Sequence, residues 1–321
     1  MSVLGQGPAM SNLCTNPSLV DDGASGGDVR LLPARAVPLG GVRAIRVDRL
    51  LPHRSLPTVG AWCFLDRFGP QHDDMTVLPH PHTGLQTVTW PFAGEVRHRD
   101  SLGSDVVIKP GQLNLMTAGR GISHSEFSLG DRPLLDGLQL WLALPAASDG
   151  VAPAFEQHAD LPVFSDHSLR ATVFIGSIGG VTSPATTYSP LVGADFSVAP
   201  GDTATVPLRT DFEHALVVIE GSLTALGQEL PSGPMLYLGT NRDHVTVTSD
   251  SGARAILLGG APYTDDLVMW WNFVGRSHDD IATAREQWQH GDRFGLVDGH
   301  DGARIPAPPL PGVRLTPRRR S

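Results

Sequence analysis

Residues 85–116 read LQTVTWPFAGEVRHRDSLGSDVVIKPGQLNLM, and this stretch decides the fold. It contains four short apolar or alternating runs, at residues 85–90, 95–98, 106–108 and 113–116, with Gly or Pro between them. Short runs bounded by turn residues are typical of β-strands, and strands at this regular spacing are typical of a sandwich or barrel. The stretch therefore predicts a β domain with many short strands.

The same pattern continues on both sides of this stretch. The run at 137–144 ends the first series at Pro145, and a second series follows a weakly periodic segment. The second series contains short runs at residues 171–175, 203–206, 215–219, 235–238, 244–248 and 255–258. The turn Phe-Ala-Gly-Glu-Val of the first series resembles Ile-Glu-Gly-Ser-Leu of the second. A duplicated β-barrel is the simplest account of this repetition.

Composition limits the classes of protein that the chain can represent. Of its 321 residues 40% are hydrophobic, which is enough for a substantial core. Gly and Pro together make up 63 of the 321 residues and argue against long helices. The net charge of −9 disfavours a nucleic-acid scaffold, so no direct nucleic-acid partner is expected. The basic end at 318–320 is expected to be a solvated tail, with a nucleic-acid arm as the alternative.

The chain carries no sign of a membrane or secretory protein. No apolar run approaches the ~18 residues that a membrane span requires, so no membrane partner is expected. The N-terminal segment has neither the basic residues nor the compact apolar stretch of a signal peptide. Cys14 and Cys63 cannot form a disulfide framework, which fits a reducing compartment. A cytoplasmic location is the default expectation.

One helix is predicted near the C-terminus. Ser277 can cap its first turn with Asp280 as the capping-box partner, and Gly291 suits the position after its last turn. The predicted organisation is a mobile leader at 1–29, an N-terminal barrel at 30–145, a connector at 146–170, a C-terminal barrel at 171–262, a returning segment with the helix at 263–300 and a tail at 301–321.

Four candidate metal ligands stand in two pairs with the same spacing. One residue separates His80 from His82, and one separates His124 from Glu126. In a strand, residues i and i+2 point to the same face with Cα atoms about 6.5 Å apart. Each pair can therefore aim both donors at one ion through bonds near ~2.1 Å. Two such strands facing across a barrel would supply three imidazoles and one carboxylate and leave open positions on a six-coordinate ion.

Each pair alone is weak evidence, because the chain has 13 histidines and a lone His-x-His is more often structural than ligating. Both pairs occur in one predicted β domain, however. Burying three imidazoles and a carboxylate in a barrel without a shared cation would be costly. The combination favours a metal site. The string Gly-Arg-Gly-Ile-Ser-His at 119–124 lacks the third Gly of a dinucleotide loop and opens no predicted helix, so that alternative is rejected.

Four ordered motifs around these residues resemble the pirin family. They are Phe-Leu-Asp-Arg-Phe-Gly-Pro at 64–70, His-Pro-His-Thr-Gly at 80–84, Gly-Glu-Val-Arg-His-Arg-Asp-Ser at 94–101 and Met-Thr-Ala-Gly-Arg-Gly-Ile-Ser-His-Ser-Glu at 116–126. The resemblance is close over roughly residues 60–145 and looser elsewhere. It implies an all-β fold of two cupin, jelly-roll-type β-barrels in tandem, with a short C-terminal helix in a segment that returns to pack on the first barrel.

The resemblance also implies the site. His80, His82, His124 and Glu126 are expected to bind one divalent metal ion, usually iron in this family, in the N-terminal barrel. By ligand type Fe(II) is the first choice, and Mn, Ni, Cu and Zn remain open. Many pirins have Glu at the position of Gln86. Here Gln86 could lie beside the metal as a hydrogen-bonding neighbour, but it cannot be an anionic ligand or a base.

Family members are described as quercetin 2,3-dioxygenases and, in other settings, as transcriptional co-regulators or modulators of metabolic enzymes. The first hypothesis is therefore an Fe(II) dioxygenase that opens a flavonol ring, with Glu126 as the catalytic residue that accepts the flavonol hydroxyl proton. The alternative is a metal-bearing regulatory protein without catalysis of its own, whose partner is another protein. A third hypothesis is an enzyme acting on another small aromatic or enolic substrate.

The C-terminal barrel is expected to lack metal ligands. When its Gly turns are set on those of the first barrel, the places of the four ligands are taken by Pro207, Arg209, Thr246 and Thr248. This pattern favours a degenerate barrel that is kept for packing.

The sequence also predicts roles for several other residues near the motifs. Asp66 and Phe68, placed in a predicted turn, are expected to be structural and not catalytic. His98 and Asp100 follow a hairpin and are expected to form a hydrogen-bonded pair at the surface. The tryptophans at 270–271 are expected to pack between the barrels. Arg120 is predicted near the cavity mouth, where it could meet an anionic substrate group.

Overall fold

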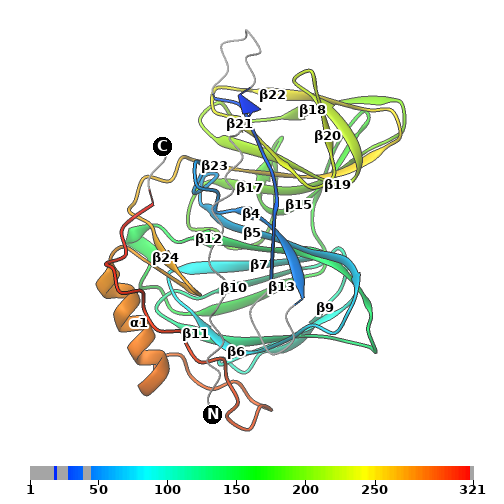
Figure 1. Cartoon of the computed structure of the whole chain (residues 1–321). Helices are drawn as coiled ribbons and strands as arrows, with labels where there is room; N and C mark the ends of the chain where they lie inside the picture. The colour runs from blue at the N-terminus through cyan, green and yellow to red at the C-terminus, as the bar shows by residue number, and fades with distance from the viewer. Residues whose placement is uncertain (1–17, 20–27, 39–44, 319–321) are drawn as a thin grey trace, which may run out of the picture.

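A computed structural model of the chain describes residues 18–19, 28–38 and 45–318. The described chain forms two β-rich halves, the N-terminal half below the C-terminal half in Figure 1. The leader predicted at 1–29 lies mostly outside the described residues, as does Cys14. No helix within the described ranges combines the length and the apolarity needed to cross a membrane.

The N-terminal half contains two antiparallel sheets. The larger sheet has the strand order β13-β10-β7-β12-β5-β4-β3. Its strands are β3 (Arg35–Pro38), β4 (Arg46–Leu51), β5 (Trp62–His72), β7 (Leu85–Ala93), β10 (Leu113–Thr117), β12 (Leu134–Ala143) and β13 (Ala154–His158). The smaller sheet has the order β6-β11-β8-β9. Its strands are β6 (Thr76–His82), β8 (Val96–Asp100), β9 (Asp105–Ile108) and β11 (Ile122–Ser128).

The C-terminal half is one sheet system of 12 strands. Its strands are β1 (Ser18–Leu19), β2 (Arg30–Leu32), β14 (Val163–Asp166), β15 (Leu169–Ile178), β16 (Val181–Thr182), β17 (Leu191–Val198), β18 (Asp202–Pro207), β19 (Glu213–Ala225), β20 (Gln228–Pro231), β21 (Met235–Gly239), β22 (His244–Ser249) and β23 (Ala253–Gly260). Because β1 pairs with β2 and β2 pairs with β21, these two strands belong to the C-terminal half although they precede the N-terminal half in the sequence. The segment between the halves also contains a 3₁₀ turn at Ala146–Ser148, and β13 and β14 add one strand to each half.

Strand β7 shows why the two halves stack. Its side chains alternate, so that Val88 and Trp90 belong to a core shared with the C-terminal half, whereas Thr89 lines the interior of the N-terminal half. The Trp90 ring stacks on Phe174 with centroids 5.0 Å apart, and its Nε1 donates to Asp195 Oδ2 at 2.9 Å. Burying each of these large side chains contributes about 1.5–3 kcal/mol. The shared core therefore holds the larger N-terminal sheet in place on one side of the interior of the N-terminal half.

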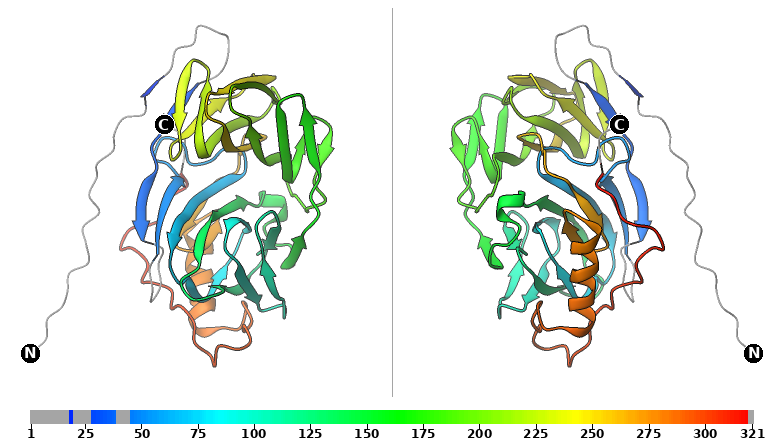
Figure 2. Two further views of the ribbon diagram at one scale, coloured as in Figure 1. Left: turned by 90° about the vertical axis from the view of Figure 1, so that its right-hand side faces the viewer. Right: turned by 90° about the vertical axis from the view of Figure 1, so that its left-hand side faces the viewer.

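The chain then returns to the N-terminal half. Strands β24 (Val268–Trp270) and β25 (Phe273–Gly275) form a hairpin, and helix α1 (His278–His290) follows it. The predicted capping box of Ser277 and Asp280 is confirmed, and the helix ends immediately before Gly291. The backbone N–H of Val274 donates to the Thr83 carbonyl at 3.1 Å, which anchors the hairpin beside β6. Figure 2 shows α1 running along the N-terminal half in both views.

Residues 303–318, the C-terminal strap, lie along helix α1. Trp288 Nε1 donates to the carbonyl of Ile305 at 2.9 Å, and Arg285 Nε donates to the carbonyl of Pro308 at 2.6 Å. The backbone N–H of Arg318 donates to Leu267 O at 3.0 Å. These contacts hold an irregular, Pro-rich segment in one path beside the N-terminal half.

Candidate metal centre

The two ligand pairs predicted from the sequence lie on neighbouring strands of the smaller sheet. Strand β6 carries His80 and His82, and β11 carries His124 and Glu126. The strands are antiparallel partners, with His80 directly opposite His124 and an irregularity in the register between His124 and Glu126. The expectation that the two strands face each other across a barrel is therefore wrong: they are hydrogen-bonded side by side, and one sheet face carries the whole set.

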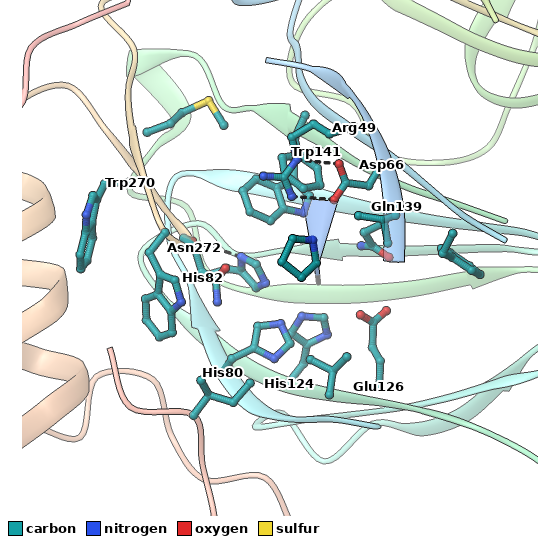
Figure 3. Close-up of a pocket in the computed structure, with 18 of the residues that line it drawn as sticks. Arg49, Asp66, His80, His82, His124, Glu126, Gln139, Trp141, Trp270 and Asn272 are labelled. Carbon is teal, nitrogen blue, oxygen red and sulfur yellow. Dashed lines mark hydrogen bonds and ion pairs between the residues drawn. The ribbon is translucent and has the colours of Figure 1, made fainter. Parts of the chain in front are cut away.

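Three imidazoles meet at one point of this face. The ring centroids of His80 and His124 are 4.4 Å apart, and His82 lies 5.0 Å from each of them. One nitrogen from each ring can be chosen so that all three lie within 4.8 Å of one another. Glu126 forms a second such group with His124 and His98. Figure 3 shows the Glu126 carboxylate beside His124, on the same cavity.

Hydrogen bonds decide which nitrogen of each ring is free. His80 Nδ1 donates to the carbonyl of Leu78 at 2.9 Å, and His82 Nδ1 donates to the carbonyl of Asn272 at 3.1 Å. Carbonyl oxygens only accept, so the proton of each neutral ring lies on Nδ1 and Nε2 keeps a lone pair. His124 Nε2 is buried and has no hydrogen-bond partner among the described residues. A buried polar atom without a partner costs about 1–3 kcal/mol, and a metal ion would remove that cost.

The electrostatics of the site suit a cation. Burial, opposed by the hydrogen bond to Leu78, lowers the pKa of His80 to about 4. Burial likewise lowers the pKa of His82 and His124 well below the ordinary value. The rings are therefore neutral at pH 7 and able to coordinate. Three neutral imidazoles with one carboxylate fit a first-row divalent transition metal.

Glu126 is held in place by a neighbouring hydroxyl. Thr89 Oγ1 lies 3.2 Å from Glu126 Oε1 and 3.1 Å from Gln139 Oε1, so its single proton can serve either acceptor. Burial raises the pKa of Glu126, while His98 and Thr89 act in the opposite direction. The carboxyl group is thus suited both to binding a cation and to accepting a proton.

The site forms the floor of a cavity of about 580 Å³. On one wall the rings of Phe64 and Trp141 are stacked, with centroids 4.1 Å apart and planes 14° apart. Opposite the imidazoles, Arg49 makes two hydrogen bonds of 2.7 Å to the carboxylate of Asp66, as Figure 3 shows. A flat aromatic ligand could therefore lie in the cavity against Phe64 and Trp141 and reach the imidazoles.

The returning part of the chain completes the cavity. Trp270 and Trp271 belong to the β24–β25 hairpin, line the cavity and pack against a cluster that includes residues of α1. The expectation that they lie between the barrels is therefore wrong. Ile305 and Arg318 of the C-terminal strap also line it. The side chain of Arg318 therefore faces the cavity as well as solvent.

Two further expectations about the site are corrected by the structure. Gln86 does not lie beside the sheet face that carries the three imidazoles. It shares the alternation of Val88 and Trp90, and its amide donates to Thr117 Oγ1 at 2.9 Å and to the Thr186 carbonyl at 3.1 Å. Arg120 lines a separate, smaller cavity together with Asp149 and Arg293, so it does not stand at the mouth of the imidazole cavity.

The pair of His98 and Asp100 is also not at the surface. His98 Nε2 lies 3.0 Å from Asp100 Oδ2, and the two side chains are only 3% and 0% exposed. Both residues are on β8, the other neighbour of β11, where His98 stands opposite Glu126. The predicted hydrogen-bonded pair is therefore present, but the prediction that it lies at the surface is wrong. The alternation of His98 and Asp100 with two arginines was the available signal for a buried face.

Among the described residues, the candidate ligands of this site come from the N-terminal half. Both groups of three ligands found among the described residues belong to the N-terminal half. His214, on β19, is buried in the C-terminal half, with Nδ1 lacking a partner within the described chain.

Comparison with known proteins identifies the family. A family model described as Pirin matches residues 44–142, and one described as Pirin C-terminal cupin domain matches residues 193–295. The chain belongs to the pirin family. The two cupin domains and the short C-terminal helix expected from the sequence are thereby confirmed.

The sequences of relatives of this pirin align with most of the chain. A Pseudomonas aeruginosa protein named "Putative quercetin 2,3-dioxygenase" is 46% identical over 283 residues, covering 87% of this chain and 89% of that protein. A Caulobacter vibrioides pirin-like protein is 37% identical over 274 residues, covering 82% of this chain and 94% of the relative. The crystal structure of a quercetin 2,3-dioxygenase from Acinetobacter baumannii superposes with a TM-score of 0.85 at 39% identity, covering 89% of this pirin and 97% of that chain.

Proposed function

We propose that this pirin is a metal-dependent dioxygenase that opens the ring of a flavonol-like substrate, with Fe(II) as its metal. The observation that carries the proposal is the cluster of three neutral imidazoles, one with a buried unpartnered Nε2, on the floor of an aromatic-lined cavity. The names of the Pseudomonas and Acinetobacter relatives support the choice of reaction.

The residues proposed to hold the ion are His80, His82 and His124 through Nε2, together with the Glu126 carboxylate. When bound, the ion would supply Lewis acidity and a route for electrons between an enolate and O₂. The remaining work belongs to the chain itself. The rings of His80 and His82 keep fixed orientations because their Nδ1 atoms donate to backbone carbonyls. Nδ1 of His124 lies 3.4 Å from Nδ1 of His98.

Glu126 is proposed to accept the proton of the flavonol hydroxyl group. Its raised pKa brings it closer to the working pH than an exposed carboxylate, which is what a general base requires. Thr89 can donate to Oε1 and so keep the second oxygen directed toward the substrate. The deprotonated substrate is the species that reacts with O₂.

The walls are proposed to select a flat and anionic substrate. Phe64 and Trp141 offer an aromatic face, and such rings prefer stacked or edge-on partners. Arg49 and Arg318 line the cavity, and the positive charges of Arg35 and Arg49 both act on Arg318. An anionic ligand would reduce the repulsion between these guanidinium groups.

The test is a turnover assay with quercetin. The protein is loaded with Fe(II) under anaerobic conditions, quercetin is added, and air is admitted. The proposal predicts bleaching of the visible absorption and release of one carbon monoxide for each O₂ consumed, because both oxygen atoms enter the ring-opened product. Metal-free protein is the control.

Absence of bleaching with any divalent metal would instead favour the regulatory alternative, in which the metal orders a surface for a protein partner. Bleaching of a different enol or phenol, but not of quercetin, would keep the oxygenase and change the substrate.

A further inference from the structure

The third imidazole differs from the other two in how it is anchored. His80 and His82 donate to backbone carbonyls, whereas His124 Nδ1 lies 3.4 Å from Nδ1 of another histidine, His98. A carbonyl can only accept, but an imidazole nitrogen can accept or donate. The direction of the hydrogen bond between His98 and His124 therefore depends on what lies beyond His98.

Asp100 lies beyond His98 and decides that direction. Its Oδ1 accepts the backbone N–H groups of Leu102 at 2.9 Å and Ser104 at 3.1 Å, and its Oδ2 faces His98 Nε2 at 3.0 Å. An ionised carboxylate only accepts, so His98 Nε2 carries the proton and Nδ1 keeps a lone pair. His124 must then donate from Nδ1, and its lone pair lies on Nε2, the unpartnered atom that faces the cavity.

We propose that Asp100 and His98 form a buried relay that sets the tautomer of His124, so that His98 is a positioning residue of the metal centre and not a ligand. The inference rests on the metal site of the proposed function but not on the identity of the reaction. Carboxylate–histidine–metal arrangements of this kind fix ring orientation and raise ligand basicity, and disturbing them typically weakens metal binding 10- to 100-fold.

The competing assignment is that His98 is itself a ligand, since its ring lies close to His124 and Glu126. Two observations oppose it. Both ring nitrogens of His98 already have partners, at 3.0 Å and 3.4 Å. Its ring is stacked on Phe155, with centroids 4.4 Å apart and planes 18° apart, and it is absent from the described residues that line the cavity.

Asp100→Asn tests the relay with little change of shape. The Asn oxygen can keep the two backbone donors of the turn, which leaves the amide NH₂ facing His98 Nε2. His98 Nε2 must then accept a hydrogen bond, so the ring proton of His98 moves to Nδ1. His98 Nδ1 becomes the donor to His124 Nδ1, and the proton of His124 moves to Nε2. Co(II) affinity, measured by chelator competition at a single pH, should fall 10- to 100-fold. His98→Phe keeps an aromatic ring against Phe155 and should lower the affinity similarly.

Asp105→Asn is the matched control, because it makes the same Asp-to-Asn change in the same hairpin but at an exposed carboxylate that pairs with Arg97. It should change the affinity less than twofold. The double variant D100N/H98F should bind no more weakly than H98F alone, because Asp100 acts only through His98. A purely structural role for Asp100 would instead weaken the double variant further.

A spectroscopic signature completes the test. Proton NMR of the Co(II)-loaded wild type should show three hyperfine-shifted exchangeable imidazole N–H signals, and in H98F the signal of His124 should move and exchange faster with solvent. A fourth such signal, or equal Co(II) affinities for wild type, D100N and H98F, would overturn the relay alone. Wild-type protein without any shifted imidazole signal would overturn the metal site as well. Should H98F fail to fold, D100N decides.

Discussion

Acidification should destabilise the metal-free protein, because its buried histidines must remain neutral in the folded state. His80 has an ordinary pKa of 6.5, and burial lowers it to about 4 in the fold. Between these two values the unfolded chain binds more protons than the folded chain, so stability falls as the pH falls. Above pH 6.5 the stability that depends on a neutral His80 is intact, and below pH 4 it is fully lost.

The size of the effect follows from the two pKa values. For His80, lowering the pH from 7 to 5 removes roughly 2 kcal/mol of folding free energy. His214 also has a pKa lowered to about 4, mainly by burial, and adds a similar amount. Burial raises the pKa of Glu126 and of Asp66, and these groups act in the opposite direction. The difference between wild type and a His80 variant is therefore the quantity to measure.

The assay is urea unfolding of the chelator-treated protein at pH 7 and pH 5. His80→Gln cannot titrate, so its loss of unfolding free energy between these pH values should be roughly 2 kcal/mol smaller than that of wild type. His167→Gln is the control, because the side chain of His167 is 93% exposed, and it should behave as wild type. Equal pH dependences for wild type and H80Q would refute the argument that His80 is buried and neutral.

Three further substitutions test the cavity. Glu126→Gln should abolish quercetin turnover even where metal is retained, measured by carbon monoxide release and metal content, and wild-type rates would disprove the proton-accepting role. Arg49→Met should cost about 3 kcal/mol in urea unfolding, because it leaves the 1%-exposed Asp66 carboxylate without its partner, while the double variant with Asp66→Asn should recover most of the loss. Arg318→Ala should raise the KM for an anionic substrate about tenfold, with kcat and metal content unchanged. Arg314→Ala, outside the cavity, should leave the KM unchanged. Equal KM values for wild type and Arg318→Ala would exclude Arg318 from substrate binding.

Much of the fold could be predicted because the signals are local. Short alternating runs between Gly and Pro gave the strands, and Ser277 with Asp280 gave the start of α1. The same alternation could have placed Gln86, since residues of equal parity on β7 share a face with Trp90 of the inter-half core. The prediction that it neighbours the metal followed the family and not the pleat.

The parts of the site that could not be predicted depend on long-range pairing. His98 enters the site because β8 pairs with β11 and sets it opposite Glu126, and this register is not visible in the sequence. Trp270 and Arg318 reach the cavity only because the chain returns across the N-terminal half, where Thr83 anchors the hairpin. No local pattern encodes that path.

The most direct test of the account is anomalous diffraction from crystals grown with Fe(II) or Co(II). One ion should lie within about 2.3 Å of Nε2 of His80, His82 and His124, with the Glu126 carboxylate beside it and His98 still bonded to Asp100. An ion bound elsewhere, or imidazoles turned away from a common point after metal soaking, would contradict it.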